Sequence, residues 1–156
     1  MIEVDIPDFG HLVLEHLVLD YNGTLACDGE PIDGITRRLK KLSQNMKIHV
    51  VTADTFGKAR ERLMGLPVEL KILDPGRQAE SKARYVESLE PERTVAMGNG
   101  RNDRIMLERA RLGIAVTEGE GCSVEALTAA DVCTRTIPDA LDLLLNPKRL
   151  IATLRS

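Results

Sequence analysis

The feature that most constrains this fold is an alternation of short apolar runs with segments of helical periodicity. Runs with apolar residues on both faces are typical of buried parallel strands. They occur at 17–20, 47–52, 94–97 and 112–116. Strands that alternate with helices predict a parallel sheet covered by helices on both faces. With right-handed crossovers, this is a doubly wound, Rossmann-like α/β fold of five to six strands.

The rest of the chain fits around this sheet. Further strands are expected at 68–72 and 131–134, and alternating residues at 2–6 and 12–15 predict a peripheral hairpin. The turn-rich stretch 25–34 is too short for an inserted domain, so we expect no cap domain and a single domain over 1–156. Apolar spacing predicts helices at 35–46, 56–63, 79–89, 106–110, 138–145 and 148–154, and a short Ala-rich helix after Gly121.

The composition excludes several functional classes. Hydrophobic residues make up 43% and charged residues 29% of the 156 residues, a balance typical of globular proteins. A net charge of -3 and 3% aromatic residues favour neither nucleic acid nor an anionic membrane surface as partner. Cys27, Cys122 and Cys133 are scattered and suggest neither a disulfide framework nor a zinc site. With no run long enough to span a bilayer and no basic leader, we expect a cytoplasmic protein.

Polar residues that suit phosphoryl chemistry follow the predicted strands. In an open α/β sheet the carboxyl ends of the strands meet at one edge, where ligands bind. A carboxylate there can attack phosphorus, a hydroxyl and a lysine can hold phosphoryl oxygens, and further carboxyl or amide oxygens can bind Mg²⁺. The residues concerned are Asp20, Asn22, Thr24, Thr52, Lys82, Asn99 and Asp103.

Simpler interpretations remain open for each residue. Asp20 before Asn-Gly fits a turn, and Thr52 fits an N-cap for a helix starting at 53–55. Lys82 fits a solvated helix face, in which case Lys71 or Lys58 would take its role. Asn99 and Asp103 fit a Gly-rich turn followed by a helix N-terminus. His16 and His49 fit packed core histidines, and the acidic residues of the predicted loops fit solvated charges: Asp28, Glu30, Glu118 and Glu120.

Four motifs in this order resemble the haloacid dehalogenase superfamily of phosphotransferases. Leu19-Asp20-Tyr21-Asn22-Gly23-Thr24-Leu25 is similar to the first motif of the family, usually DxDGT, and Val51-Thr52 to the second. Lys82 is similar to the third, and the run 98–103, GNGRND, to the fourth, usually GDGxND. The short spacing between the motifs and the segment Val51-Thr52-Ala53-Asp54 most resemble the phosphorylation domain of P-type ATPases and its small soluble relatives.

The resemblance implies a Mg²⁺-dependent phosphohydrolase that works through an aspartyl phosphate. Asp20 would be the nucleophile and a metal ligand, with the Asn22 carbonyl, Asn99 and Asp103 as the other ligands. Thr52 and Lys82 would bind the transferring phosphoryl group, and the supporting residues of the two loops would be Gly23, Thr24 and Asn102.

Two residues depart from the family pattern. Asn22 replaces the aspartate that serves as general acid and base, and such catalysis contributes about 10²- to 10⁴-fold. P-type pumps also lack this aspartate, so we expect slow breakdown of the aspartyl phosphate. Asn99 replaces a metal-binding aspartate, and the loss of a negative ligand weakens Mg²⁺ binding.

Three alternatives stay open. The paired loss of carboxylates fits a catalytically impaired regulatory or interaction module. A receiver-like phosphoacceptor domain also places Asp, Thr and Lys at strand ends, although its phosphoacceptor lies on a later strand. A dinucleotide-binding module fits less well, since the run 98–103 lacks the third glycine. Without a cap, the site suits a macromolecular substrate, or a small phosphorylated one enclosed by a protein partner or a neighbouring subunit of a homo-oligomer.

Overall fold

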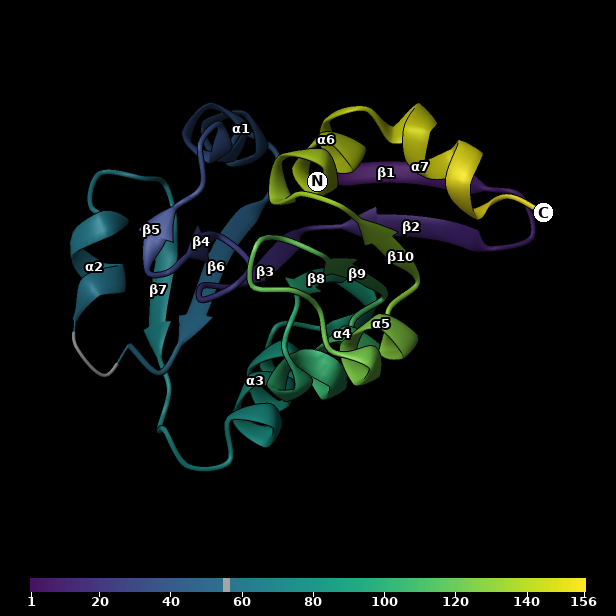
Figure 1. Cartoon of the computed structure of the whole chain (residues 1–156). Helices are drawn as coiled ribbons and strands as arrows, with labels where there is room; N and C mark the ends of the chain where they lie inside the picture. Colours follow the sequence, from purple (N-terminus) through teal and green to yellow (C-terminus); the bar gives the residue numbers. More distant parts are fainter. Residues whose placement is uncertain (55–56) are drawn as a thin grey trace.

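A six-stranded parallel sheet forms the centre of the computed structural model, which describes residues 1–54 and 57–156 (Figure 1). The strand order is β10-β9-β8-β3-β6-β7. The predicted α/β fold with a parallel sheet is therefore confirmed. The strands are β3 (His16–Asp20), β6 (Lys47–Thr52), β7 (Glu69–Ile72), β8 (Thr94–Gly98), β9 (Leu112–Val116) and β10 (Val132–Thr134).

The strand order reverses beside β3. From β3 the chain adds β6 and β7 on one side, and then returns to add β8, β9 and β10 on the other. The loops after β3 and β8 consequently leave the sheet next to each other and open a crevice at its carboxyl edge, the usual place of ligands in such folds. At one edge of this sheet lies β7.

Helices cover both faces of the sheet (Figure 1). On one face lie α3 (Gln78–Ser88), α4 (Arg104–Arg109) and α5 (Val124–Ala129), and on the other lie α1 (Ile35–Leu42) and α6 (Ile137–Leu145). The last helix, α7 (Pro147–Leu154), packs against α6 and the strand at residues 2–6. Successive strand residues point to opposite faces: Val18 packs in the core beneath α3 and α4, whereas Leu17 and Leu19 pack in the larger core beneath α1 and α6. The remaining short elements are α2 (Lys58–Arg62) and the 3₁₀ turns η1 (Pro91–Arg93) and η2 (Arg101–Asp103).

Two antiparallel hairpins accompany the main sheet. The first, β1 (Ile2–Ile6) with β2 (Gly10–Leu14), is the predicted peripheral hairpin. The second, β4 (Ala26–Cys27) with β5 (Glu30–Pro31), lies within the stretch 25–34 that the sequence marks as turns alone. In the described part of the chain, no helix has the length and apolar character needed to cross a membrane.

Two helices are shorter than predicted. The first ends at Leu42, because the chain turns through Ser43 to reach the start of β6; Met46 is outside the helix but still buried at 6% exposure, which explains its place in the apolar pattern. The second begins at Lys58, after Gly57 in the left-handed region. Phe56, which contributed to that prediction, lies outside the described residues.

Candidate active site

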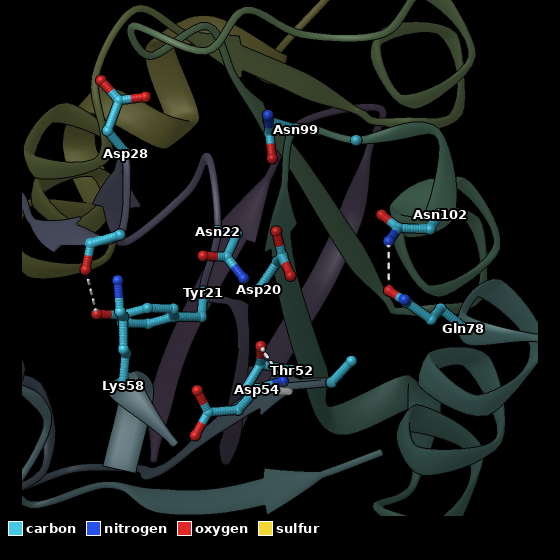
Figure 2. A pocket seen from close by; sticks show the side chains of 13 residues that line it. Asp20, Tyr21, Asn22, Asp28, Thr52, Asp54, Lys58, Gln78, Asn99 and Asn102 are labelled. Carbon is cyan, nitrogen blue, oxygen red and sulfur yellow. Dashed lines mark hydrogen bonds between the residues drawn. The ribbon is translucent and has the colours of Figure 1, made fainter. Parts of the chain in front are cut away.

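The carboxyl ends of β3, β6 and β8 bring the predicted polar residues to one pocket of about 510 Å³ (Figure 2). Asp20 is the last residue of β3, Thr52 is the last of β6, and Asn99 follows β8. All three line the pocket together with the predicted residues Asn22 and Asn102. Four ionisable or amide side chains that are absent from the predicted set of site residues also line the pocket: Asp28, Asp54, Lys58 and Gln78.

Lys82 lies beneath the pocket between two carboxylates. It comes from the middle of α3 and is 1% exposed, so the solvated-face interpretation is wrong. Its Nζ donates to Asp20 Oδ1 at 2.7 Å and to Asp103 Oδ1 at 2.6 Å. Burial opposes the charge of Lys82, but Asp20 and Asp103 outweigh it and raise the pKa of the ammonium. Lys82 is therefore held as a cation beside the carboxylate of Asp20.

When both carboxylates are ionised, this cluster holds one more buried negative charge than positive charge. Asp20 is 5% exposed and Asp103 is fully buried, and Lys82 is the cation that both contact. Burial, followed by the charge of Asp103, raises the pKa of Asp20 to about 7, although Lys82 acts in the opposite direction. Two carboxylates that share one ammonium make a site that favours an additional cation.

Asp103 is fixed by the backbone of the loop that precedes it. Its Oδ2 accepts from the N–H of Asn99 at 2.9 Å and from that of Gly100 at 2.8 Å. Gly98 makes this fold-back possible, because a Cβ there would lie 2.6 Å from Asp103 Cγ. The Gly-rich run thus shapes a loop that presents a buried carboxylate to Lys82.

Asn99 links the first motif to the loop after β9. Its Oδ1 accepts from the Thr24 hydroxyl at 3.2 Å, and its Nδ2 donates to the Gly121 carbonyl at 2.9 Å. The Gly121 contact fixes the amide so that its oxygen faces the loop of Asp20. Gly23, at φ +81°, permits this approach, since a Cβ there would lie 2.7 Å from Asn99 Oδ1.

Thr52 does not cap the helix that follows it. The described residues 53 and 54 are not helical, and the carboxylate of Asp54 instead accepts from the N–H of Ala59 at 2.9 Å, near the start of α2. Thr52 Oγ1 accepts from the N–H of Asp54 at 3.2 Å, which leaves the hydroxyl proton available to a ligand in the pocket. Thr55, the last residue of the predicted helix start, lies outside the described residues.

The donor atoms fit Mg²⁺. The side-chain donors are oxygens of Asp20, Asn99 and Asp103, and hard oxygen ligands are those that Mg²⁺ takes in proteins. The Thr24 hydroxyl lies within 3.4 Å of Asp20 Oδ2 and 3.2 Å of Asn99 Oδ1, so these two oxygens converge. The unbalanced charge of the cluster adds a reason for a divalent cation. Asn22 lies beside Asp20 (Figure 2), where its carbonyl role stays a prediction.

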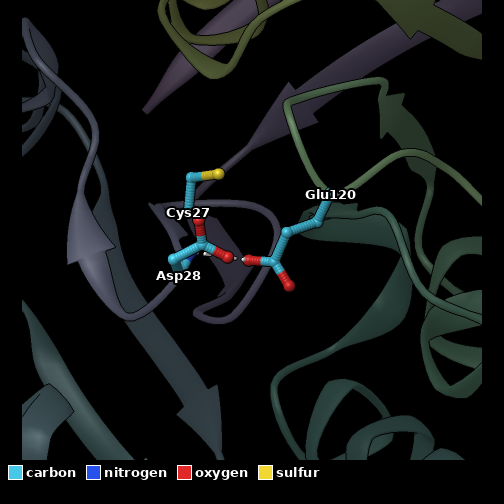
Figure 3. Close-up of side chains that lie close together, drawn as sticks. All are labelled: Cys27, Asp28 and Glu120. Atoms are coloured by element: carbon cyan, nitrogen blue, oxygen red, sulfur yellow. Dashed lines mark hydrogen bonds between the residues drawn. The ribbon is translucent and has the colours of Figure 1, made fainter.

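Two loops meet at the mouth of the pocket. Figure 3 shows Cys27 and Asp28 of the β4–β5 hairpin facing Glu120 of the loop after β9. The N–H of Asp28 donates to Glu120 Oε2 at 3.2 Å, and ligand atoms of the three side chains lie within 4.8 Å of one another. Asp28 and Glu120, expected as solvated charges, therefore join the β4–β5 hairpin to the loop after β9.

The two predicted core histidines lie away from the pocket. His49 is 2% exposed and lies between His16 and Tyr85. Its Nε2 is 3.1 Å from Nδ1 of His16, and its Nδ1 is 3.0 Å from the hydroxyl of Tyr85. His16 begins β3, at the end of the strand opposite Asp20. Burial lowers the pKa of His49, with smaller lowering contributions from His16 and Lys47, while Glu69 raises it. This cluster is packed and hydrogen-bonded, as the sequence suggests.

Part of the chain is similar in sequence to known proteins. The family model of haloacid dehalogenase-like hydrolases matches residues 79–139, which include Lys82, Asn99 and Asp103. An uncharacterised protein of Methanocaldococcus jannaschii is 40% identical over 84 residues, which are 51% of this chain and 90% of that protein.

Two solved structures illustrate the likeness in fold. The 3-deoxy-D-manno-octulosonate 8-phosphate phosphatase of Moraxella catarrhalis, in complex with magnesium and phosphate ions, aligns with a TM-score of 0.64 and 17% identity over 91% of this chain and 94% of that one. The catalytic domain of the CPx-ATPase CopB-B aligns with a TM-score of 0.61 and 26% identity over 74% of this chain and 46% of that one.

Proposed function

Since this chain belongs to the haloacid dehalogenase superfamily, we propose that it is a Mg²⁺-dependent phosphohydrolase that forms an aspartyl phosphate on Asp20 and breaks it down slowly. The observation that carries the proposal is the buried cluster of Asp20, Lys82 and Asp103 at the floor of an open pocket. A carboxylate at the sheet edge with a fixed ammonium beside it suits attack on phosphorus.

The proposed reaction begins when an Asp20 oxygen attacks the phosphorus of a phosphate monoester. The new bond joins this oxygen to phosphorus, and the bond from phosphorus to the ester oxygen breaks. Lys82 Nζ and the Thr52 hydroxyl hold phosphoryl oxygens as charge shifts among them. Mg²⁺, held by Asp20, Asn99 and Asp103, would neutralise charge on the phosphoryl group. Water then releases inorganic phosphate from Asp20.

The proposed slow step follows from Asn22. The leaving oxygen needs a proton, and the water that attacks the phosphoenzyme must lose one. An amide at position 22 can do neither, so both protons exchange with solvent. Asn22 lines the pocket beside Asp20, which supports this interpretation of its role. The phosphoenzyme is therefore expected to accumulate, as the resemblance of the first two motifs to those of P-type ATPases also suggests.

Turnover of p-nitrophenyl phosphate with and without Mg²⁺ tests the proposal. We expect slow, Mg²⁺-dependent release of phosphate that Asp20→Asn abolishes while the fold is retained. The amide is nearly isosteric and can still accept from Lys82, so circular dichroism of this variant should match that of the native protein. Turnover that survives in Asp20→Asn would contradict the assignment of the nucleophile.

A second candidate is a phosphate-responsive interaction module without useful turnover. The observation that favours it is Asn99, whose amide is hydrogen-bonded at both ends and joins the loop after β9 to Thr24. Binding at this site would then be transmitted to the β9 loop. Mg²⁺-dependent binding of beryllofluoride, without hydrolysis of any ester, would favour this candidate over the phosphohydrolase.

A further inference from the structure

The pocket has room beyond the phosphoryl group. Its volume of about 510 Å³ is within the range of small-molecule sites, about 300–1,000 Å³. Asp20 and Thr52 occupy its floor, whereas Tyr21, Asp28 and Lys58 form one wall and Gln78 and Asn102 the opposite wall (Figure 2). Apart from the Tyr21 ring, these walls are polar, so they suit a small polar leaving group.

The charged groups of the site are nearly all engaged already. Lys82 is bound to Asp20 and Asp103. Asp54 accepts from backbone N–H groups of α2 at 2.9 and 3.4 Å. The carboxylate of Asp28 is the exception: among the described residues it has no hydrogen bond or ion pair, and it lies near the like-charged carboxylate of Glu120 (Figure 3). On the next turn of α2, Arg62 is paired with Glu30 at 2.6 Å.

Lys58 differs from these groups. It is exposed, projects into the pocket at the first turn of α2, and has no hydrogen bond or ion pair with any of the residues that the structure describes. Asp28 lines the same wall, yet no ion pair joins it to Lys58 in the described chain. A lysine ammonium on a flexible four-carbon stem can reach an anion without a fixed geometry.

We infer that Lys58 binds a second anionic group on the leaving side of the substrate. The substrate class is then a small phosphate monoester whose alcohol also carries a carboxylate or another phosphate. This inference rests on the proposed function, because it assumes that the phosphoryl group lies between Asp20 and Thr52. Lys58 thus becomes a specificity residue, separate from the residues that hold the phosphoryl group.

Binding of non-hydrolysable phosphonates tests the inference without requiring turnover. Three alkyl phosphonates of equal length, ending in a carboxylate, a hydroxyl or an ammonium group, would be titrated calorimetrically with Mg²⁺ present, over several chain lengths. At an exposed ion pair, a contribution of up to about 1 kcal/mol corresponds to about fivefold in Kd. We therefore expect the carboxylate compound of the best length to bind about fivefold more tightly than the hydroxyl compound.

Variants assign this preference to Lys58. The ratio of the Kd of the hydroxyl compound to that of the carboxylate compound should fall to about one in Lys58→Gln and persist in Lys58→Arg. The control is Lys71→Gln, on the outer strand β7 and away from the pocket, which should leave this ratio unchanged. Tightest binding of the ammonium compound, or a ratio that Lys58→Gln does not alter, would overturn the inference. Failure of p-nitrophenyl phosphate turnover, by contrast, would count against the proposed function alone, since these Kd ratios do not depend on catalysis.

Discussion

Replacing Lys82 with methionine should destabilise the protein strongly. Methionine has a similar length but leaves Asp20 and Asp103, at 5% and 0% exposure, without their shared cation. Removal of one partner from a buried ion pair costs about 3–5 kcal/mol, because the remaining charge stays buried. The free energy of unfolding, measured by urea denaturation in Mg²⁺-free buffer, should fall by this amount. A matched Lys71→Met change on the exposed face of β7 should cost no more than about 0.5 kcal/mol.

A double variant separates charge from packing. If the cost arises from unpaired carboxylates, Asp20→Asn should recover much of the stability lost in Lys82→Met, since it removes one of the two buried charges. If the cost arises from packing alone, the two changes should be additive. A loss in Lys82→Met no larger than that in Lys71→Met would refute the buried ion cluster as described.

Two further predictions concern His49 and Asn99. Because burial lowers the pKa of His49, this histidine takes up a proton at a higher pH in the unfolded chain than in the folded protein. Its contribution to stability is therefore present above about pH 6.5 and is lost as the pH falls through the lowered pKa. The raised pKa of Asp20 makes its contribution to stability change with pH in the opposite direction. The effect of His49 is therefore measured as the difference in urea midpoint between the native protein and His49→Gln from pH 7.5 to 5.5. A difference that stays constant over this range would contradict the prediction. Asn99→Asp should lower the unfolding free energy without Mg²⁺ by about 1–3 kcal/mol, because a carboxylate oxygen replaces the donor to the Gly121 carbonyl. Mg²⁺ should stabilise this variant more than the native protein in thermal unfolding, and equal stabilisation would rule out Asn99 as a ligand position.

The sheet could be predicted because its strands are buried on both faces. The central strands are rich in apolar residues on both faces, as at Leu17–Leu19, and such runs have few alternatives in a globular chain. The exact helix ends could not be predicted in the same way. Met46 continues the apolar spacing of α1 but reaches the core from a turn, so periodicity alone cannot distinguish the two.

The floor of the site was predictable, whereas its walls were not. Asp20, Thr52 and Asn99 each end or follow a predicted strand, and strand ends converge by topology. Lys58 and Asp28 reach the pocket through a short helix and a two-residue hairpin, whose directions depend on tertiary contacts such as the Tyr21 hydroxyl donating to the Gly29 carbonyl at 3.1 Å. The Asp28-Gly29 turn was the one local signal for that hairpin.

The lifetime of phosphate on Asp20 tests the central claim most directly. The native protein and Asn22→Asp would be incubated with Mg²⁺ and acetyl phosphate, and the phosphorylated residue would be located by borohydride reduction and mass spectrometry. We predict that Asp20 carries the phosphoryl group and that this group persists about 10²- to 10⁴-fold longer in the native protein than in Asn22→Asp, because the variant regains a general acid and base. Absence of label on Asp20, or equal lifetimes in the two proteins, would contradict the account.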